Sequence, residues 1–343
     1  MIKLVTGNLL KADAEAIVNT VNTVGIMGKG VALQFKQAYP DNYDAYRKAC
    51  DHHEVQLGKM FIFSTDKLVN PKYIINFPTK RHWKGKSRME DIEAGLIALI
   101  EVVKKLGIHS IAIPPLGCGS GGLHWDEVKP RIEAAFKELP NVSVLLFRPQ
   151  GAPQAEDMRV ATKRPAMTPG RAALLGLVER YIMPGYRLTL LEIQKLAYFL
   201  QAAGEPLRLN FIKGKYGPYA ETLHHVLQRL EGHFIRGYGD RSRYASVRLL
   251  PGATDEANSF LKNHEDTMQR LDRVARLIEG FETPYGMELL SSVHWLARET
   301  PEVKKDSSAA IKGVKSWSEH KKQTFHPEHI EVAWTRLREE GWM

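Results

Sequence analysis

The sequence predicts a layered α/β domain with a mixed sheet over residues 1–150 and a mostly helical domain with minor β structure over residues 170–343. The chain of 343 residues is longer than one compact core usually holds. In its first part, short β-branched runs alternate with amphipathic stretches, which is typical of α/β layers. In its second part, apolar residues recur mainly at helical spacing. Between them, residues 151–169 lack apolar periodicity and are rich in Pro, Gly and Ala, which indicates a linker.

The elements of the first domain follow from these patterns in chain order. Helices are expected to begin near Gly30, Asp41, Met89 and Asp126. The third of them places apolar residues at spacings of three and four, which forms one buried stripe. Strands are expected at residues 2–5, 16–19, 60–63, 73–77, 110–113 and 143–147.

The second domain has fewer strand signals. Residues 188–204 carry enough apolar side chains for a helix that is buried on most sides, with Gly204 as its stop. Pro218 precedes a helix predicted at residues 219–230, and residues 268–278 repeat the helical spacing. Two β-like pieces, residues 207–212 and 244–250, are expected to form a hairpin or a wing beside these helices.

Composition narrows the functional classes. The formal net charge of +9 and the pI near 9.3 suit a polyanionic substrate or partner. No apolar run approaches the roughly 20 residues that span a bilayer, and the N-terminus lacks the long apolar region of a signal peptide, so we expect a cytoplasmic protein without membrane contact. Cys50 and Cys118 are far apart, which argues against a disulfide framework and a thiolate zinc site. We expect neither a metal site nor a cofactor.

Two glycine-rich loops are the most informative feature. The first is GIMGKG, residues 25–30, and the second is PPLGCGSGGLHW, residues 114–125, directly after a predicted strand. Glycine lets successive N–H groups turn towards one anion, so the pair of loops could hold a diphosphate. A Walker A loop is excluded because Gly30 follows Lys29 and Thr23 stands at the first glycine position.

A dinucleotide-dependent dehydrogenase is disfavoured by the second loop. Gly117, Gly119 and Gly122 satisfy G-x-G-x-x-G, but no acidic residue for a ribose ends the next strand and the motif lies late in its domain. The remaining alternative is that both loops are only tight turns.

The motifs TGNLL, AIVNTVNTVGIMGKGVALQF and IAIPPLGCGSGGLHW together resemble a macrodomain, a three-layer α/β fold that binds ADP-ribose. The resemblance covers residues 1–150 with the three motifs in order. VNTVNTVGIMGKGVALQFK and NFPTKRHW are more narrowly similar to the DarG branch, antitoxins that remove ADP-ribose from DNA bases modified by the toxin DarT. The resemblance implies hydrolysis of the base–ADP-ribose glycosidic bond in single-stranded DNA, with thymidine as the expected base.

The resemblance also implies an ADP-ribose site. Residues 7–9 would hold the adenine, the first loop would lie over the distal ribose, and the second would cradle the diphosphate. Asn22 would bind the distal ribose hydroxyls, or alternatively would satisfy its own turn. Many macrodomains have an aspartate in place of Asn8, so weaker base discrimination is expected. The complete predicted set is Gly7, Asn8, Leu9, Asn19, Asn22, Gly25, Gly28, Lys29, Gly30, Val31, Thr79, Pro115, Leu116, Gly117, Cys118, Gly119, Ser120, Gly121, Gly122 and Leu123.

Lys80 is the predicted catalytic residue. Its amine can act at the anomeric carbon only if enough of it is neutral, and the cations Arg81, Lys84 and Lys86 would lower its pKa. The same basic run could instead be a solvated loop that holds a nucleic-acid backbone. In the related protein glycohydrolases a lysine works with an aspartate, and Gly121 stands at that aspartate's place. The second acid/base group is therefore unassigned, and a Schiff-base route and an oxocarbenium-like route both stay open.

Several other side chains have two interpretations. His124 and Trp125 could line the site or cap the helix near Asp126, and Trp83 could stack on a base or pack inside. We expect ordinary surface histidines at the pairs 52–53 and 224–225, since neither has the spacing of a helical metal site.

In the second domain, IQKLAYFLQ and FIKGKYGPYAETLHHVLQRLEGHFI resemble a Panacea-type antitoxin domain. A DarG protein would use this domain to bind and inhibit DarT. The alternatives are a winged-helix DNA binder and a scaffold or dimerisation domain. For the whole chain, the alternatives are a non-catalytic ADP-ribose reader and a glycohydrolase that acts on modified proteins.

Overall fold

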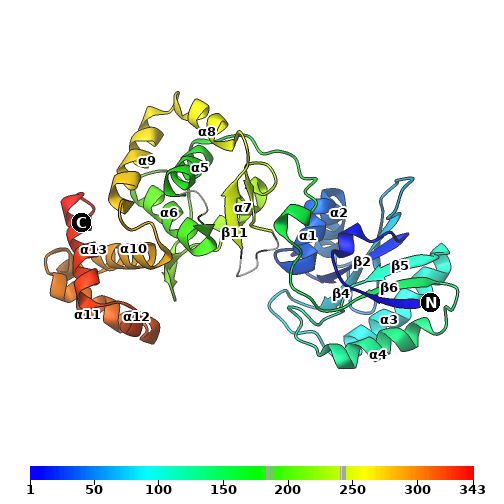
Figure 1. Ribbon diagram of the computed structural model, residues 1–343. Helices are drawn as coiled ribbons and strands as arrows, with labels where there is room; N and C mark the ends of the chain where they lie inside the picture. Colours follow the sequence, from blue (N-terminus) through cyan, green and yellow to red (C-terminus); the bar gives the residue numbers. More distant parts are fainter. Residues whose placement is uncertain (183–185, 187, 240, 242–244) are drawn as a thin grey trace. The chain divides into compact units, whose positions relative to one another are not determined.

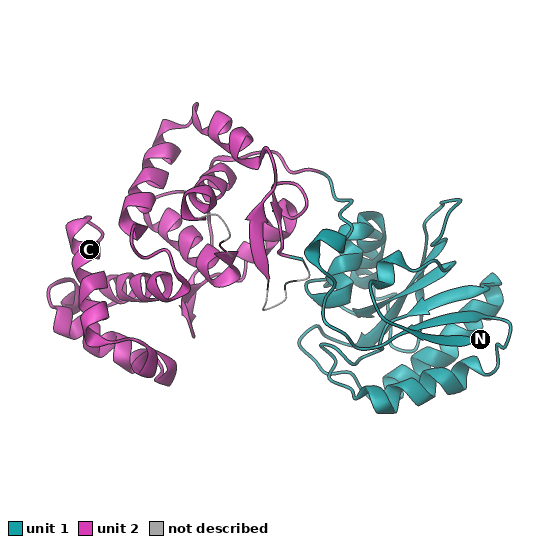
Figure 2. Cartoon of the chain, in the orientation of Figure 1, with its two compact units in different colours: residues 1–163, 239–242 teal, residues 164–238, 243–343 magenta. Residues whose placement is uncertain are grey.

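The computed structural model describes residues 1–182, 186, 188–239, 241 and 245–343. The chain forms two compact units, which Figure 2 shows in two colours. Unit 1 comprises residues 1–163 and 239–242, and unit 2 comprises residues 164–238 and 243–343. The change from one unit to the other at Lys163 and Arg164 falls inside the predicted linker, residues 151–169.

Unit 1 is built on a six-stranded mixed sheet (Figure 1), which confirms the predicted fold class. The strand order is β1-β6-β5-β2-β4-β3, and only β3 runs antiparallel to its neighbour. The bounds are β1 Ile2–Val5, β2 Ala16–Asn22, β3 Phe61–Ser64, β4 Tyr73–Lys80, β5 Ser110–Ile113 and β6 Ser143–Phe147. Strands β2 and β4 each extend three residues beyond the prediction, and this extension pairs Asn22 with Lys80 at their carboxyl ends.

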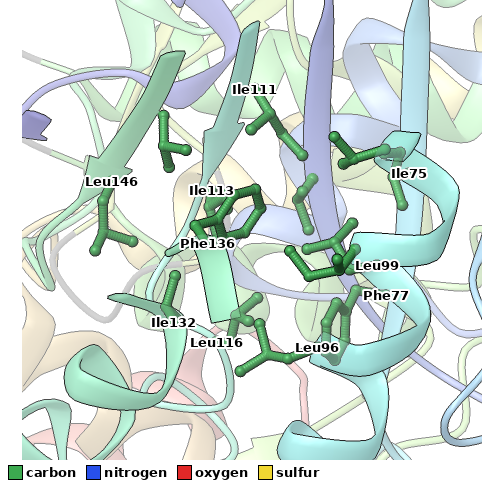
Figure 3. Packing of buried hydrophobic residues seen from close by; sticks show 14 of the residues in the cluster. Ile75, Phe77, Leu96, Leu99, Ile111, Ile113, Leu116, Ile132, Phe136 and Leu146 are labelled. Carbon is green, nitrogen blue, oxygen red and sulfur yellow. The ribbon is translucent and has the colours of Figure 1, made fainter. Parts of the chain in front are cut away.

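Helices cover both faces of this sheet. Helices α1 (Gly30–Ala38) and α2 (Pro40–Asp51) lie on one face, where Phe35 packs with Ile17 and Ile74. Helices α3 (Met89–Leu106) and α4 (Trp125–Phe136) lie on the other. Figure 3 shows the core beneath these two helices, where Leu96, Leu99, Ile132 and Phe136 meet the sheet. Two 3-10 turns, Leu9–Lys11 and Ala155–Asp157, complete the unit.

Unit 2 is mostly helical, as predicted. Its helices are α5 Pro169–Tyr181, α6 Leu190–Ala202, α7 Leu223–Leu230, α8 Ala253–Leu261, α9 Glu265–Ile278, α10 Pro284–Glu299, α11 Ser307–Trp317, α12 Glu319–Thr324 and α13 Pro327–Glu339, with a 3-10 turn at Pro301–Lys304. Its strands are β7 Leu188–Thr189, β8 Ile212–Gly214, β9 Gly217–Tyr219, β10 Ile235–Arg236 and β11 Ser246–Leu249. A capping box of Thr189 and Glu192 starts α6.

Two predictions for unit 2 are wrong. The two β-like pieces do not pair with each other: β8 forms a hairpin with β9, and β11 pairs with β10 and β7. The helix predicted from residue 219 begins only at Leu223, because the tight turn before Gly217, whose φ is +91°, places Gly217–Tyr219 in the hairpin. Tyr244, at the start of the second piece, lies outside the described residues.

A buried charged cluster joins this hairpin to the helices of unit 2. The Nζ of Lys195 donates to the carbonyl of Pro218 at 2.7 Å, and burial lowers the pKa of Lys195 to about 7. The Nζ of Lys321 donates to Glu288 Oε1 at 2.6 Å and to Ser292 Oγ at 2.9 Å. Lys321 is fully buried, and burial lowers its pKa as well.

Candidate active site

The predicted site segments meet at one edge of the unit 1 sheet. Strands β1, β2, β4 and β5 are parallel, so their carboxyl ends lie on the same side. Residues 7–9 follow β1, the first glycine loop follows β2, Lys80 ends β4, and the second glycine loop follows β5. A ligand of an open α/β sheet usually lies at this edge.

Lys80 connects β4 to the second loop. Its half-buried amine donates to the carbonyl of Trp83 at 3.2 Å and to that of Ser120 at 3.5 Å. Burial lowers the pKa of Lys80, and the charge of Lys86 lowers it further. Among the described residues, Arg81 and Lys84 are not causes of this shift, so only one of the three predicted cations acts on Lys80.

We expect Lys86→Met to raise the pKa of Lys80. The pH at which kcat/KM reaches half its plateau should then move upwards, because a higher pH is needed to give the same fraction of neutral amine. The pH–rate profile on ADP-ribosylated DNA measures this shift. Lys84→Met removes an equal charge and is the control; an equal shift in both variants would mean that total charge, and not Lys86, sets the pKa.

The second loop carries amides that are free to bind an anion. Turns within it join Cys118 N to Pro115 O, Gly122 N to Gly119 O, and Leu123 N to Gly117 O. Within the described chain, the amides of Gly117, Gly119, Ser120 and Gly121 are among those of this loop that donate no hydrogen bond. Neighbouring N–H groups of this kind form an anion-binding concavity.

The thiol in this loop is kept in its neutral form. Burial raises the pKa of Cys118 to about 11, so the thiol stays protonated at neutral pH. Leu116 is fully buried in the core below it, and Pro115 and Leu123 are half-buried. The loop is therefore anchored by apolar contacts, and its exposed residues are Gly119, Ser120, Gly122 and His124.

Gly121 is crowded on the side where a side chain would project. A Cβ built there would lie 2.3 Å from the carbonyl oxygen of Gly117 and 2.3 Å from Oγ of Ser87. An aspartate at this position therefore has no room in this loop. The absence of the lysine–aspartate pair, inferred from the sequence, has a steric reason.

We expect Gly121→Ala to displace the loop and to weaken ADP-ribose binding by at least about tenfold, the effect of losing one or two charge-assisted amide contacts. Calorimetric titration with ADP-ribose measures the affinity. Gly119→Ala is the comparison, because a Cβ at Gly119 meets no atom within 4 Å and should cost less. Equal losses in the two variants would contradict the steric explanation.

In the first loop, Asn22 binds its own turn. Its Oδ1 accepts from the amides of Val24 at 3.0 Å and Ile26 at 3.3 Å, while its Nδ2 donates to the Ile26 carbonyl at 2.6 Å. The Tyr46 hydroxyl donates to the Asn22 carbonyl at 2.5 Å. Asn22 thus has the geometry of the turn alternative, and its contact with the distal ribose stays a prediction.

The remainder of the first loop turns into α1. Gly25 and Gly30 have positive φ angles of +75° and +62°, which favour glycine. Lys29 precedes the first residue of α1 and is exposed, whereas Gly28 and Val31 are half-buried.

Asn8 is engaged in a local cap. Its Oδ1 accepts from the Leu10 amide at 2.9 Å, and its Nδ2 donates to the Asp157 carbonyl at 3.0 Å. Gly7 N donates to Gln150 Oε1 at 3.2 Å, and Leu9 is buried. These bonds use one lone pair of Oδ1 and one N–H of Nδ2, so the side chain keeps a second acceptor and a second donor, and its adenine contact stays a prediction.

Two predicted ligand residues lie inside the fold. Asn19 is fully buried, and its Nδ2 donates to Asn76 Oδ1 at 2.9 Å. Thr79 is buried, and its hydroxyl donates to the Val21 carbonyl at 3.3 Å. The structure thus brings Lys80 and Ser120 together but places these two side chains in the sheet.

The structure places the aromatic and histidine side chains for which the sequence allowed two interpretations. Trp83 is 46% exposed, which fits a stacking surface and not internal packing. His124 stands at the N-cap of α4 but makes no side-chain cap bond, and Trp125 packs against the core. His224 was predicted to be a surface residue; this is wrong, because it is buried between the hydroxyls of Tyr219 and Tyr238.

Ser87 was missed in the sequence. It is buried just before α3, and its amide donates to the Gly121 carbonyl at 3.0 Å. A single serine in the basic run KGKSR gives no periodic or motif signal, so only the structure could identify it. Over the described ranges, no three His, Cys, Asp or Glu side chains gather as a metal site would require, and no helix has the length and apolar character to cross a membrane.

Comparison with known proteins agrees with the motifs. Residues 18–132 match the Macro domain family model. A DNA ADP-ribosyl glycohydrolase from Thermus aquaticus is 49% identical over 341 residues, which cover 99% of this chain and 94% of the relative. A DNA ADP-ribosyl transferase-DNA ADP-ribosyl glycohydrolase fusion protein from Thermosipho africanus is 38% identical over 144 residues, 38% of this chain and 37% of the relative.

A solved structure, the macrodomain of Mycobacterium tuberculosis DarG, is 54% identical and covers 44% of this chain and 99% of its own, with a TM-score of 0.43. The alignment with the Thermus aquaticus relative runs through both units at high identity. The family predicted from the glycine loops is thereby confirmed. The chain belongs to the DNA ADP-ribosyl glycohydrolases, the family that the motifs predict as the DarG branch.

Proposed function

We propose that unit 1 hydrolyses the glycosidic bond between ADP-ribose and a base of single-stranded DNA, thymidine being the expected base, and that Lys80 is its catalytic residue. The observation that carries this proposal is the position of the Lys80 amine. It lies 3.5 Å from the Ser120 carbonyl, in the loop whose unpaired amides suit a diphosphate. Relatives that align with nearly the whole chain bear the name DNA ADP-ribosyl glycohydrolase.

The amine supports two routes. In its neutral form, the Lys80 amine would bond to the anomeric carbon of the distal ribose while the bond to the base breaks, and one amine proton would pass to the departing base. Ring opening would transfer the second amine proton to the ring oxygen and form a Schiff base, which water hydrolyses to free ADP-ribose and the regenerated amine. In its protonated form, it could donate a proton to the departing base while an oxocarbenium-like centre develops. The lowered pKa of Lys80 increases the neutral fraction, which the first route requires. No carboxylate can be supplied from position 121 to either route.

The substrate proposal is tested by ADP-ribose release. The full chain would be incubated with a single-stranded oligonucleotide ADP-ribosylated on thymidine, and separately with a protein ADP-ribosylated on glutamate. We expect release from the DNA alone. Tight binding of ADP-ribose without turnover would identify a reader, and release from glutamate alone would identify a protein-directed enzyme.

We further propose that unit 2 binds and inhibits the cognate DarT transferase. A Thermosipho africanus relative is named as a fusion of transferase and glycohydrolase, so the two activities occur there in one chain. A Lys80→Ala chain mixed with DarT and single-stranded DNA tests this directly. Modification should fall in proportion to the antitoxin added, although nothing removes ADP-ribose. Undiminished modification would contradict inhibition by binding.

A further inference from the structure

Ser87 carries a buried hydroxyl beside the second glycine loop. The residue is only 6% exposed, and its Oγ is a buried atom without a hydrogen-bond partner in the described structure. Most buried hydroxyls are paired, because an unpaired one has lost its contact with water and gained nothing in return. An unpaired buried hydroxyl at a functional site therefore needs an explanation.

The hydroxyl lies against the second glycine loop. A Cβ built at Gly121 would be 2.3 Å from Ser87 Oγ, and one built at Gly117 would be 3.3 Å from it. The Ser87 amide also donates to the Gly121 carbonyl at 3.0 Å. Ser87 thus supports, from its buried side, the loop whose Ser120 carbonyl accepts from Lys80.

Neighbouring Lys86 lies along the same loop. Its Nζ would be 2.9 Å from a Cβ at Gly122, and the side chain is exposed. Lys86 therefore contacts the loop from its solvent side, and Ser87 contacts it from its buried side. Ser87 Oγ lies close to the backbone of Gly121 and Gly117, so a shift of these two residues on binding an anion would change its distance to the loop.

We propose that Ser87 is a positioning residue of the hydrolase, and that its hydroxyl gains a hydrogen-bond partner only when a diphosphate occupies the second glycine loop. The inference rests on the proposed ADP-ribose site of unit 1. The Ser87 hydroxyl then contributes to the affinity for ADP-ribose and does not contribute to the stability of the fold without ADP-ribose.

The test compares Ser87→Ala and Ser87→Cys with the wild-type chain. We expect both variants to unfold at or above the wild-type temperature without ligand, since the hydroxyl has no partner to lose. We expect both to bind free ADP-ribose roughly tenfold more weakly, as for the loss of one hydrogen bond near a charged group. Cysteine is decisive, because it has the shape of serine with a somewhat larger Sγ atom but is only a weak donor. On modified DNA, KM should rise more than kcat falls.

Ser110→Ala is the matched control. The Ser110 hydroxyl accepts from the Glu15 amide at 2.9 Å at the opposite end of β5, so its removal should lower ligand-free stability and leave ADP-ribose affinity unchanged. Wild-type affinity in Ser87→Ala would overturn the inference. A lower unfolding temperature in Ser87→Ala that returns to the wild-type value in Ser87→Cys would also overturn the inference, since that pattern indicates that the side chain contributes by packing. Affinity is measured separately from turnover, so binding without DNA hydrolysis contradicts the proposed function while the variants still decide the role of Ser87.

Discussion

Replacement of Lys80 by alanine is expected to lower the rate of ADP-ribose release from modified DNA by at least about a hundredfold, the lower range for a residue in acid–base or covalent catalysis. Affinity for free ADP-ribose should stay close to that of the wild type. The loop amides that suit the diphosphate belong to Gly117, Gly119, Ser120 and Gly121. The backbone hydrogen bonds of their turns do not involve Lys80, whose amine contacts this loop at the Ser120 carbonyl at 3.5 Å. Single-turnover release from an ADP-ribosylated oligonucleotide measures the first effect, and calorimetric titration the second.

Two further variants make this result specific. Lys80→Arg keeps a cation on β4 but has essentially no neutral form, so it should be as inactive as alanine if the neutral amine reacts. Lys84→Ala is the control, because this exposed lysine lies in the same basic run and does not perturb the pKa of Lys80. Full activity in Lys80→Arg would show that the residue acts only through its charge.

The second large effect is expected in unit 2. Glu288→Gln should destabilise this unit by about 3–5 kcal/mol, the range found when one partner of a buried ion pair is removed. The Lys321 amine would remain buried, 2.9 Å from Ser292 Oγ, without its carboxylate. The double variant Glu288→Leu/Lys321→Met should recover much of the lost stability, because it leaves no buried charge without its partner.

Stability of unit 2 should also depend on pH in a defined direction. Burial lowers the folded-state pKa of Lys195 to about 7, below that of an unfolded lysine near 10.4. Between these values the unfolded chain binds more protons, so stability rises with pH across this window and is lowest below pH 7. Lys195→Met should remove most of this dependence.

Scanning calorimetry can separate the two units. ADP-ribose should raise the unfolding temperature of unit 1 alone by mass action, so the transition that does not move reports on unit 2. Glu302→Gln is a matched control on an exposed side chain of the same unit and should change stability by less than about 0.5 kcal/mol. If unit 2 of Glu288→Gln unfolds at the wild-type temperature, the buried ion pair contributes nothing to the stability of this unit.

Much of unit 1 could be predicted because local signals and tertiary structure agree there. Strands Ile2–Val5, Ser110–Ile113 and Ser143–Phe147 have the predicted bounds, since each is a short apolar run between clear breaks. The three extra residues of β2 and β4 were not predicted. They end in polar residues, Asn22 and Lys80, whose strand geometry comes from pairing with each other.

Side-chain partners were the least predictable part. The two interpretations of Asn22 could not be separated in the sequence, because the choice depends on where the Val24 and Ile26 amides turn. The burial of His224 depends on Tyr238, which is fourteen residues away and beyond a turn. Hydrophobic periodicity gives no information on such pairs.

The crowding at Gly121 restricts how this enzyme could change its chemistry. A substitution of Gly121 by aspartate would bring the new Cβ against two atoms, Ser87 Oγ and the Gly117 carbonyl oxygen, and only the first belongs to a side chain. A smaller residue at position 87 would remove the Oγ contact, but no substitution elsewhere removes the Gly117 carbonyl oxygen. A lysine–aspartate enzyme would therefore need a shift of the Gly117 backbone in addition to the aspartate itself.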